Sequence, residues 1–313
     1  MTAAASALEV LPVPAHGAED VVVATSGRDE GCVFTGTGDG SIWRISANGQ
    51  RIDRVAHTGG HPLGVELHPD GRLLVCDSTL GVLMVDPRTG GVERRLAEVD
   101  GRPMRFCNNA AIASDGTVWF SDSSTRYGQD QWKDDLIMHT RTGRLLRLDP
   151  SGEVTVVIEG LFFANGVALA ADESFVAVAE TGARTVVRHW LTGPQAGTRD
   201  YLVADLPGHP DNIARGSDGL IWVTIASPTN AALPLLDKAP TWVKVAAAKA
   251  PEWMQPKVAP CVRVQAYDNT GRLVHDVERP SDHYAMVTGV REHDGIVWMG
   301  SLEQPAVARV SLA

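Results

Sequence analysis

Short apolar runs, each joined by a polar turn to an alternating apolar and polar run, recur along most of the chain. Residues 106–124, FCNNAAIASDGTVWFSDSS, are typical: an apolar run over 110–113 leads through Asp115-Gly116 into an alternating run over 117–121. An Asp-Gly turn between runs rich in β-branched and aromatic residues is a strong hairpin signal. This stretch therefore predicts two antiparallel strands joined by a tight turn.

The turn and the strand after it occur six times. The units are DEGCVFTG, DGRLLVCD, DGTVWFSD, DESFVAVAE, DGLIWVTI and DGIVWMGS, which begin at Asp29, Asp70, Asp115, Asp172, Asp218 and Asp294. Most are followed by a third strand pattern and several by a fourth. A period near 40 to 45 residues with four short strands is typical of a β-propeller blade. We therefore predict an all-β, six-bladed propeller with four-stranded blades. A β-sandwich would explain the frequent turns but not the sixfold repeat.

Three further segments complete the predicted architecture. Residues 8–13 are apolar and should pair beside the last blade, which closes the ring and removes an exposed sheet edge. Residues 123–140 and 227–260 interrupt the period, and 241–249 read as a short helix between two prolines. Both insertions leave the same kind of strand end, so both should project over one rim of the ring. Long ordered loops are usually functional, which favours a lid over decoration.

The second insertion allows another interpretation. It carries apolar residues that would also suit a partner-docking or membrane-surface face: Leu233, Leu235, Trp242, Val243, Val245 and Trp253.

Composition narrows the functional classes. The chain has 313 residues, 44% of them hydrophobic, and a net charge of −10, which argues against nucleic acid as a partner. No apolar run reaches the length of a transmembrane helix, and the N-terminal residues lack the pattern of a secretory signal. The four cysteines are scattered without metal-ligand spacing. We expect a single domain over 1–313 in a reducing, cytoplasmic setting, with a small-molecule substrate; the sequence does not set the oligomeric state.

Candidate chemistry emerges when the inner strands are aligned on their turns. Counting back seven residues from the turn aspartate reaches Asn108, Asn165 and Asp211 in three blades and Leu63 in another. With small changes in turn length, the remaining blades contribute Glu19 and Thr288. The innermost strands of a propeller line its central channel and begin at one mouth. These six residues should therefore form a ring around the axis.

The ring residues suit a hard cation. Glu19, Asn108, Asn165 and Asp211 all offer side-chain oxygen, with two formal negative charges and no thiolate. Such a set favours Ca²⁺ over Mg²⁺ or zinc, although another divalent cation is possible. Asn and Asp also cap strands by bonding to the backbone. Four oxygen donors at six equivalent positions, where a strand prefers Val or Ile, nevertheless favour a metal site.

Several strings resemble one known family. FCNNAAIASDGTVWFSDSS, FFANGVALAADESFVAVAE, LPGHPDNIARGSDGLIWV and VREHDGIVWMGS are similar to the strictosidine synthase-like branch of the SMP-30/gluconolactonase/paraoxonase superfamily. The likeness runs from Glu19 to the last strand. It implies a six-bladed propeller with a catalytic Ca²⁺ on the axis, whose ligands match Glu19, Asn108, Asn165 and Asp211.

Two departures from the family pattern bear on function. Strictosidine synthase depends on a glutamate shortly before the EHDG string, and Thr288 stands at that position here. Asn109 stands where many relatives have Asp. The resemblance then implies a metal-dependent lactonase or esterase rather than an alkaloid-forming enzyme.

The expected reaction is attack of water on a lactone or ester carbonyl polarised by Ca²⁺. Relatives use the aspartate that matches Asp211 as general base, and His209 is a second catalytic candidate. We assign His61, Asn109 and Thr288 to substrate contact; His16 and His283 lie near the same mouth. Two alternatives remain open: a non-hydrolytic lyase or condensing enzyme that uses the same metal, and a non-catalytic propeller held by a structural ion.

Overall fold

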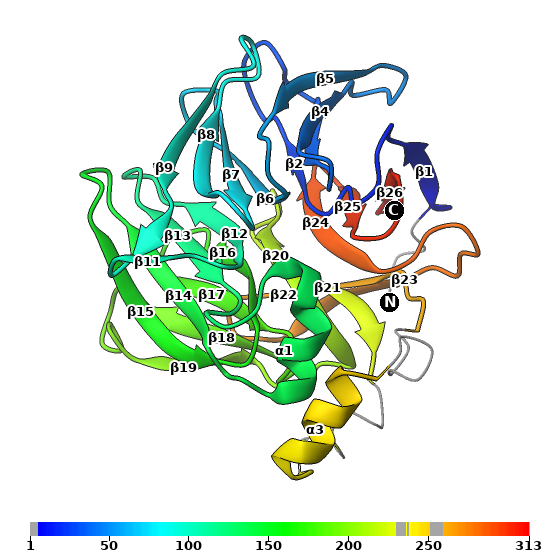
Figure 1. Ribbon diagram of the computed structural model, residues 1–313. Helices are drawn as coiled ribbons and strands as arrows, with labels where there is room; N and C mark the ends of the chain where they lie inside the picture. The colour runs from blue at the N-terminus through cyan, green and yellow to red at the C-terminus, as the bar shows by residue number, and fades with distance from the viewer. Residues whose placement is uncertain (1–5, 230–235, 237, 251–258, 313) are drawn as a thin grey trace.

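Six four-stranded antiparallel sheets surround a central axis in the computed structural model, which describes residues 6–229, 236, 238–250 and 259–312 (Figure 1). From the axis outward, the first three blades are β2 (Val21–Val23), β3 (Val33–Gly36), β4 (Ser41–Ile45), β5 (Ile52–His57); β6 (Pro62–Leu67), β7 (Leu73–Asp77), β8 (Gly81–Val85), β9 (Val92–Leu96); and β12 (Cys107–Ile112), β13 (Val118–Asp122), β14 (Gly143–Leu148), β15 (Val154–Leu161). The next two are β16 (Ala164–Leu169), β17 (Phe175–Glu180), β18 (Thr185–Trp190), β19 (Arg199–Val203); and β20 (Gly208–Arg215), β21 (Ile221–Pro228), β22 (Arg263–Tyr267), β23 (Leu273–Glu278). The predicted six-bladed propeller is confirmed.

The sixth blade closes the ring by combining the last three strands with the first strand. It contains β24 (Val287–His293), β25 (Ile296–Ser301), β26 (Ala306–Ser311) and, outermost, β1 (Glu9–Pro12). Glu9 lies opposite Arg309 in the ladder, and their side chains form an ion pair of 2.7 Å. The pairing predicted for residues 8–13 is therefore confirmed, and it covers the edge that β26 would otherwise expose.

The second strand of each blade is more buried than its alternating pattern suggests. Every residue of β13 and of β17 is buried. The reason is that neighbouring blades cover both faces of each sheet, so polar residues such as Ser121 are also enclosed. Apolar clusters fill the spaces between blades; Trp119 of the third blade, for example, packs with Val167 and Val176 of the fourth.

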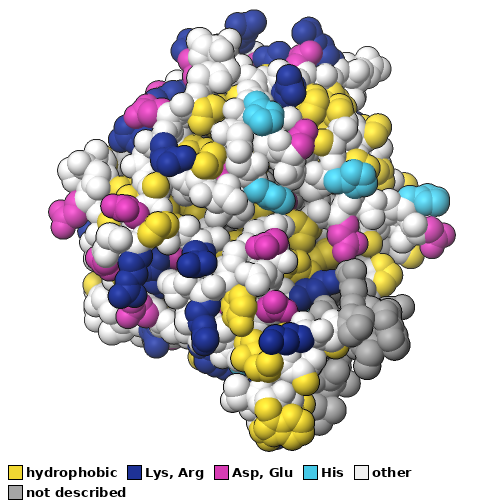
Figure 2. Space-filling model, viewed as in Figure 1, with side chains coloured by type: hydrophobic (Ala, Val, Ile, Leu, Met, Phe, Trp, Pro, Cys, Tyr) yellow, Lys and Arg dark blue, Asp and Glu magenta, His cyan; other side chains and the backbone are white. Residues whose placement is uncertain are grey.

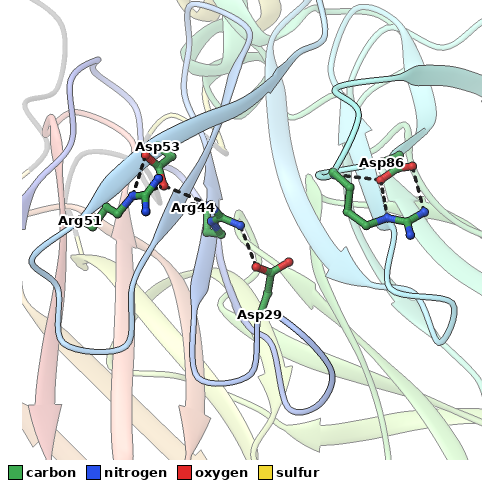
Figure 3. Close-up of polar contacts among 6 residues, drawn as sticks. Asp29, Arg44, Arg51, Asp53 and Asp86 are labelled. Carbon is green, nitrogen blue, oxygen red and sulfur yellow. Dashed lines mark hydrogen bonds and ion pairs between the residues drawn. The ribbon is translucent and has the colours of Figure 1, made fainter.

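The outer strands carry ion pairs at the surface. In the first blade, Arg44 on β4 contacts Asp29 at 2.8 Å and Asp53 on β5 at 3.1 Å, and Arg51 also contacts Asp53 (Figure 3). Charged side chains on outer strands oppose edge-to-edge pairing with other molecules.

Both insertions project from the same rim, as predicted. The first forms a 3-10 turn, η1 (Gln129–Gln131), and α1 (Trp132–Met138) between β13 and β14; the second forms α3 (Thr241–Ala248) between β21 and β22. The two helices contact each other and lie side by side (Figure 1). The helix expected over 241–249 is confirmed, and it begins directly after Pro240.

The residues proposed as a docking face are described only in part. Trp242 is 74% exposed and Val245 is 36% exposed, and Figure 2 shows apolar side chains at the tip where α3 lies. Leu233, Leu235 and Trp253 lie outside the described residues.

Three smaller features complete the fold. A two-stranded hairpin, β10 (Glu98–Val99) and β11 (Arg102–Pro103), links the second and third blades. All four cysteines are free thiols, and Cys76 and Cys107 are buried, as expected from their apolar strands. Among the described helices, none has the length and apolar character needed to cross a membrane.

Candidate metal centre

Each ring residue from the second to the sixth blade lies where the inner strand leaves regular pairing. The register between first and second strands shifts between Cys107 and Ala110, and between Ala164 and Val167. The other three blades shift at the equivalent points, which are Pro62 to Val65, Pro210 to Ile213 and Val287 to Val290. A β-bulge bends a strand and redirects a side chain. The bulges thus remove the ring residue and the residue after it from the ladder.

The structure brings several ring residues together. The charges of Glu19 and Asp211 interact, and Asp211 also interacts with the Asn165 side chain. The Thr288 hydroxyl donates a hydrogen bond of 2.8 Å to the main-chain oxygen of Glu19. Residues from blades one, four, five and six therefore lie near one another at one end of the channel.

The two ring asparagines present free oxygens. Asn108 Nδ2 donates to Ser123 Oγ at 3.0 Å, and Asn165 Nδ2 donates to Thr181 Oγ1 at 3.1 Å. These bonds occupy the amide nitrogens and fix the side chains. The Oδ1 atoms of both residues are buried without a hydrogen-bond partner, as is Oδ1 of Asp211. Buried polar atoms are normally paired, so this cluster of unpaired oxygens fits a cation-binding site.

The pKa shifts of the two ring carboxylates also fit a cation-binding site. The pKa of Glu19 is raised well above its usual value, first by burial and then by the charges of Asp211 and Asp20. Burial raises the pKa of Asp211 to about 7, against an opposing contact with Asn165. In the described part of the chain neither carboxylate forms an ion pair with Lys or Arg. A bound cation would favour the ionised form of both acids.

The donor chemistry also explains a negative observation. Among the described residues, no cluster of three or more His, Cys, Asp or Glu side chains is arranged to hold a metal. The ring contributes only two such groups, Glu19 and Asp211, and its other oxygens are carboxamides. Carboxamide and carboxylate oxygens together suit Ca²⁺, so Glu19, Asn108, Asn165 and Asp211 fit the predicted ion.

A second polar layer, which was not predicted from the sequence, lies one residue further along each inner strand. Asp20, Asn109 and Asn212 alternate around the axis with three glycines, which are Gly64, Gly166 and Gly289. Asp20 Oδ2 accepts hydrogen bonds from Val65 N and from Asn109 Nδ2, both at 3.0 Å.

The glycines let neighbouring inner strands approach closely. A Cβ atom at Gly64 would lie 2.7 Å from Asn109 Cα, and one at Gly289 would lie 2.6 Å from Asp20 Cα. The same alignment that located the ring, moved by one position, would have revealed this alternation of polar residues and glycine.

Asn212 connects the two layers. Its Nδ2 donates to Glu19 Oε2 at 3.2 Å, while its Oδ1 is buried without a partner. It thus fixes one oxygen of a predicted metal ligand and offers a further unpaired oxygen beside it.

The histidines of the mouth divide into two groups. His209 is buried, and its Nδ1–H donates to the main-chain oxygen of Thr181 at 2.9 Å. Burial lowers the pKa values of both His209 and His61, so each is neutral at pH 7, and the tautomer fixed at His209 leaves a lone pair on Nε2. His16 and His283 are exposed. Figure 2 shows histidine side chains gathered on one half of this face.

Two predicted substrate contacts have their polar atoms on protein partners. Asn109 donates to Asp20 and accepts from Val167 N at 2.9 Å, and the Thr288 hydroxyl donates to Glu19 as described above. Both residues are buried. This arrangement favours a supporting role for them, and substrate contact stays a prediction.

The ring also borders an apolar cluster at the second blade. Leu63 packs with Phe106, Phe162 and Phe163, and Leu136 of α1 joins the same cluster. The rings of Phe106 and Phe163 meet edge to face at 5.2 Å. Helix α1 is therefore anchored beside the ring residue of the second blade.

Sequence comparison identifies relatives over nearly the whole chain. A family model described as strictosidine synthase matches residues 108–194. The adipocyte plasma membrane-associated protein of Salmo salar is 33% identical over 90% of this chain and 73% of its own length. Strictosidine synthase-like protein 10 of Arabidopsis thaliana is 31% identical over 93% of this chain and 84% of its own length.

Solved structures share the fold at lower identity. A gluconolactonase from Xanthomonas campestris superposes with a TM-score of 0.72 at 15% identity, covering 99% of this chain and 90% of its own. Regucalcin from Agrobacterium tumefaciens, a calcium-binding protein, gives a TM-score of 0.68 at 13% identity, covering 98% and 94%. Likeness at these identities demonstrates the propeller fold alone.

Proposed function

The chain belongs to the strictosidine synthase-like branch of the SMP-30/gluconolactonase/paraoxonase superfamily, and from that premise we propose that it is a Ca²⁺-dependent hydrolase of lactones or esters. The observation that carries the proposal is the set of three unpaired buried oxygens, on Asn108, Asn165 and Asp211, beside the carboxylate of Glu19. Gluconolactonase and regucalcin among the proteins of the same fold support the substrate class and the ion.

The residues divide the chemistry between them. Glu19, Asn108, Asn165 and Asp211 would hold the ion, which when bound supplies Lewis-acid polarisation of a substrate carbonyl. Asn212 offers a fifth oxygen and orients Glu19. Asp211 takes a proton from the attacking water, because its half-buried carboxylate lies at the mouth of the channel. Water adds to the carbonyl carbon, the carbon–oxygen bond of the ester breaks, and the released alcohol receives a proton.

His209 is the second candidate for proton transfer. Its Nδ1–H is held by Thr181, whose hydroxyl also holds Asn165. The lone pair on Nε2 can therefore accept a proton without a change of tautomer. This link through Thr181 ties the orientation of the imidazole to that of a predicted metal ligand.

The two insertions serve as a lid in this proposal. Helix α1 is fixed to the ring side of the molecule by Leu136 and by Asp135, which accepts hydrogen bonds from Ser124 and Thr140 at 2.5 and 2.6 Å. A covered mouth excludes bulk water from the reacting carbonyl. The free thiols further support a cytoplasmic, reducing location.

A structural ion is the second candidate function. The four predicted ligands come from four different blades, so an ion there would also hold the ring together. A panel of lactones and aryl esters, assayed with Ca²⁺ and with chelator, separates the two. We expect turnover of at least one substrate class that chelation removes. Chelation that lowers the melting temperature while no substrate is hydrolysed would favour the structural ion and contradict the hydrolase.

A further inference from the structure

A cavity of about 290 Å³ lies at the far end of the channel, away from α1 and α3. All six inner strands contribute to it, through residues that follow the ring residues by two to six positions; Ala111, Ala168 and Ala214 are each three residues beyond. At about 3.3 Å per residue, this places the cavity roughly 10 Å along the axis from the ring. Water fills about 30 Å³ per molecule in the liquid, so the cavity has room for roughly ten non-hydrogen atoms.

The polar layer beneath the ring separates the cavity from the candidate metal centre. The hydrogen bond between Asn109 and Asp20 joins the third blade to the first across the axis, and Asn212 joins the fifth blade to the first. A ligand in the cavity would therefore not contact the predicted metal ligands. The two sites share no residue.

The charged side chains that line the cavity differ in the protein partners that balance their charge. Glu66 and Arg291 form an ion pair with each other, and their side chains are 17% and 15% exposed. Glu292 is buried and accepts hydrogen bonds from the Ser217 hydroxyl and from the backbone N–H groups of Asp218 and Gly295.

Arg215 differs from these three groups. It is exposed at the opening, and its hydrogen-bond partner is the main-chain oxygen of Ala170, at 3.3 Å. Within the described residues, no carboxylate lies within ion-pair distance of Arg215. The accessible, uncompensated charge of the cavity is therefore positive.

The walls between these polar groups are small and aliphatic. Val22, Ala111, Ala168 and Ala214 surround the axis at the level of the Glu66–Arg291 pair. Such walls offer no hydrogen bonds, so they suit the hydrocarbon part of a ligand.

We propose that this far-end cavity is a binding site for a small aliphatic carboxylate. The carboxylate pairs with the guanidinium of Arg215 at the opening, and the hydrocarbon chain lies against the alanine walls. Arginine binds carboxylates through paired, charge-assisted hydrogen bonds. The inference does not depend on the hydrolase proposal, since it uses none of the ring residues.

Calorimetric titration of the full chain with sodium hexanoate tests the site, with hexanamide as the uncharged control. Hexanoate should saturate one site, and hexanamide should bind much more weakly. Arg215→Gln should weaken hexanoate binding about tenfold or more, because a hydrogen bond to a charged group is lost. Arg102→Gln, an exposed arginine on β11, is the matched control and should bind like the parent.

A filling variant and a ring variant complete the design. Ala214→Leu places extra carbon in the cavity and should block hexanoate, and Asn165→Ala should leave hexanoate binding unchanged. Equal binding by the parent and Arg215→Gln would overturn the proposal, as would absence of binding or a loss confined to Asn165→Ala. The last result would locate the carboxylate at the ring.

Discussion

Carboxylates occupy two contrasting environments in this propeller, the axis and the outer strands. On the outer strands, Asp53 lies between Arg51 and Arg44 (Figure 3), and hydrogen bonds from both arginines lower its pKa. On the axis, Glu19 is buried and Asp211 is half-buried beside other acids and oxygens, and burial raises both pKa values. Among the described residues, the outer carboxylate therefore has basic partners, whereas the two axial carboxylates have none.

This difference indicates that the axial carboxylates need a cation from outside the chain, whereas the outer carboxylates do not. An exposed ion pair contributes about 0–1 kcal/mol because water already solvates its charges. Buried acids without a basic partner oppose folding unless they are protonated or bind a cation. Substitutions should thus have large and ion-dependent effects on the axis and small, ion-independent effects on the outer strands.

Catalysis gives the largest expected contrast. Asp211→Asn keeps the shape of the side chain but removes a charged ligand and the candidate base, so hydrolysis should fall by roughly 10²–10⁴-fold or more. Asp53→Asn on the outer strand should keep full activity. Steady-state rates on the best substrate of the panel, measured in excess Ca²⁺, test both. Parent-like turnover by Asp211→Asn would refute the axial mechanism.

Stability against pH separates the two environments next. Unfolded carboxyl groups titrate near pH 4, whereas Asp211 in the fold titrates at about 7. Between these values the folded protein holds protons that the unfolded chain has released, so stability falls as pH rises. Without Ca²⁺, we expect the melting temperature to drop by roughly 5 °C or more from pH 4.5 to pH 7.5.

Two comparisons isolate the axial contribution. The lowered pKa values of the outer acids act in the opposite direction, but their effect is complete by about pH 4. The buried histidines are the same in the parent and in Asp211→Asn, so the difference between these two curves removes their contribution. Added Ca²⁺ should flatten the parent curve. Parallel curves for parent and variant, with and without Ca²⁺, would show that Asp211 is not the source.

Affinity for the ion should show a smaller, reversible effect. Asn165→Ala removes one neutral oxygen ligand, so Ca²⁺ binding should weaken roughly tenfold, and excess Ca²⁺ should restore part of the activity. Asn48→Ala, in an exposed turn of the first blade, is the matched control. Calorimetric titration measures both. Unchanged Ca²⁺ affinity in Asn165→Ala would remove this residue from the ligand set.

The smallest effect is expected at the surface. Arg51→Gln removes one of the two arginine partners of Asp53, and the side chain of Arg51 is 74% exposed. Its free energy of unfolding should change by less than about 1 kcal/mol, with or without Ca²⁺. Chemical denaturation in both conditions checks this. A Ca²⁺-dependent change at this position would mean that the two environments are coupled.

The fold and the ring positions could be predicted from the sequence because the chain is built from repeats. Equal spacing from each turn identifies equivalent residues, which is why Asn108, Asn165 and Asp211 could be aligned without coordinates. The roles of the next residues were less accessible. The side chain of Asn109 bonds to Asp20 and Val167, because the bulge decides which neighbour each side chain meets. Its contact with substrate stays a prediction.

The sequence repeat does not predict which residues of different blades contact each other. The pair formed by Glu66 and Arg291 joins residues 225 positions apart, and nothing local in either strand predicts the partner. The packing of Leu136 against Leu63 is similar, since an insertion outside the period has no equivalent segment to guide its placement.

The seam of the sixth blade, where β1 pairs with β26, has a consequence for how the molecule can be built. Because β1 pairs with β26, β1 must wait for β26 to be synthesised, and the ring closes only after all six blades have been translated. The same seam brings the two terminal strands together in space. A circularly permuted gene could therefore join them with a short linker and open the chain in an exposed turn such as residues 192–197. If each blade folds as a unit, such permutants should retain the axial site while changing the order in which its ligands are made.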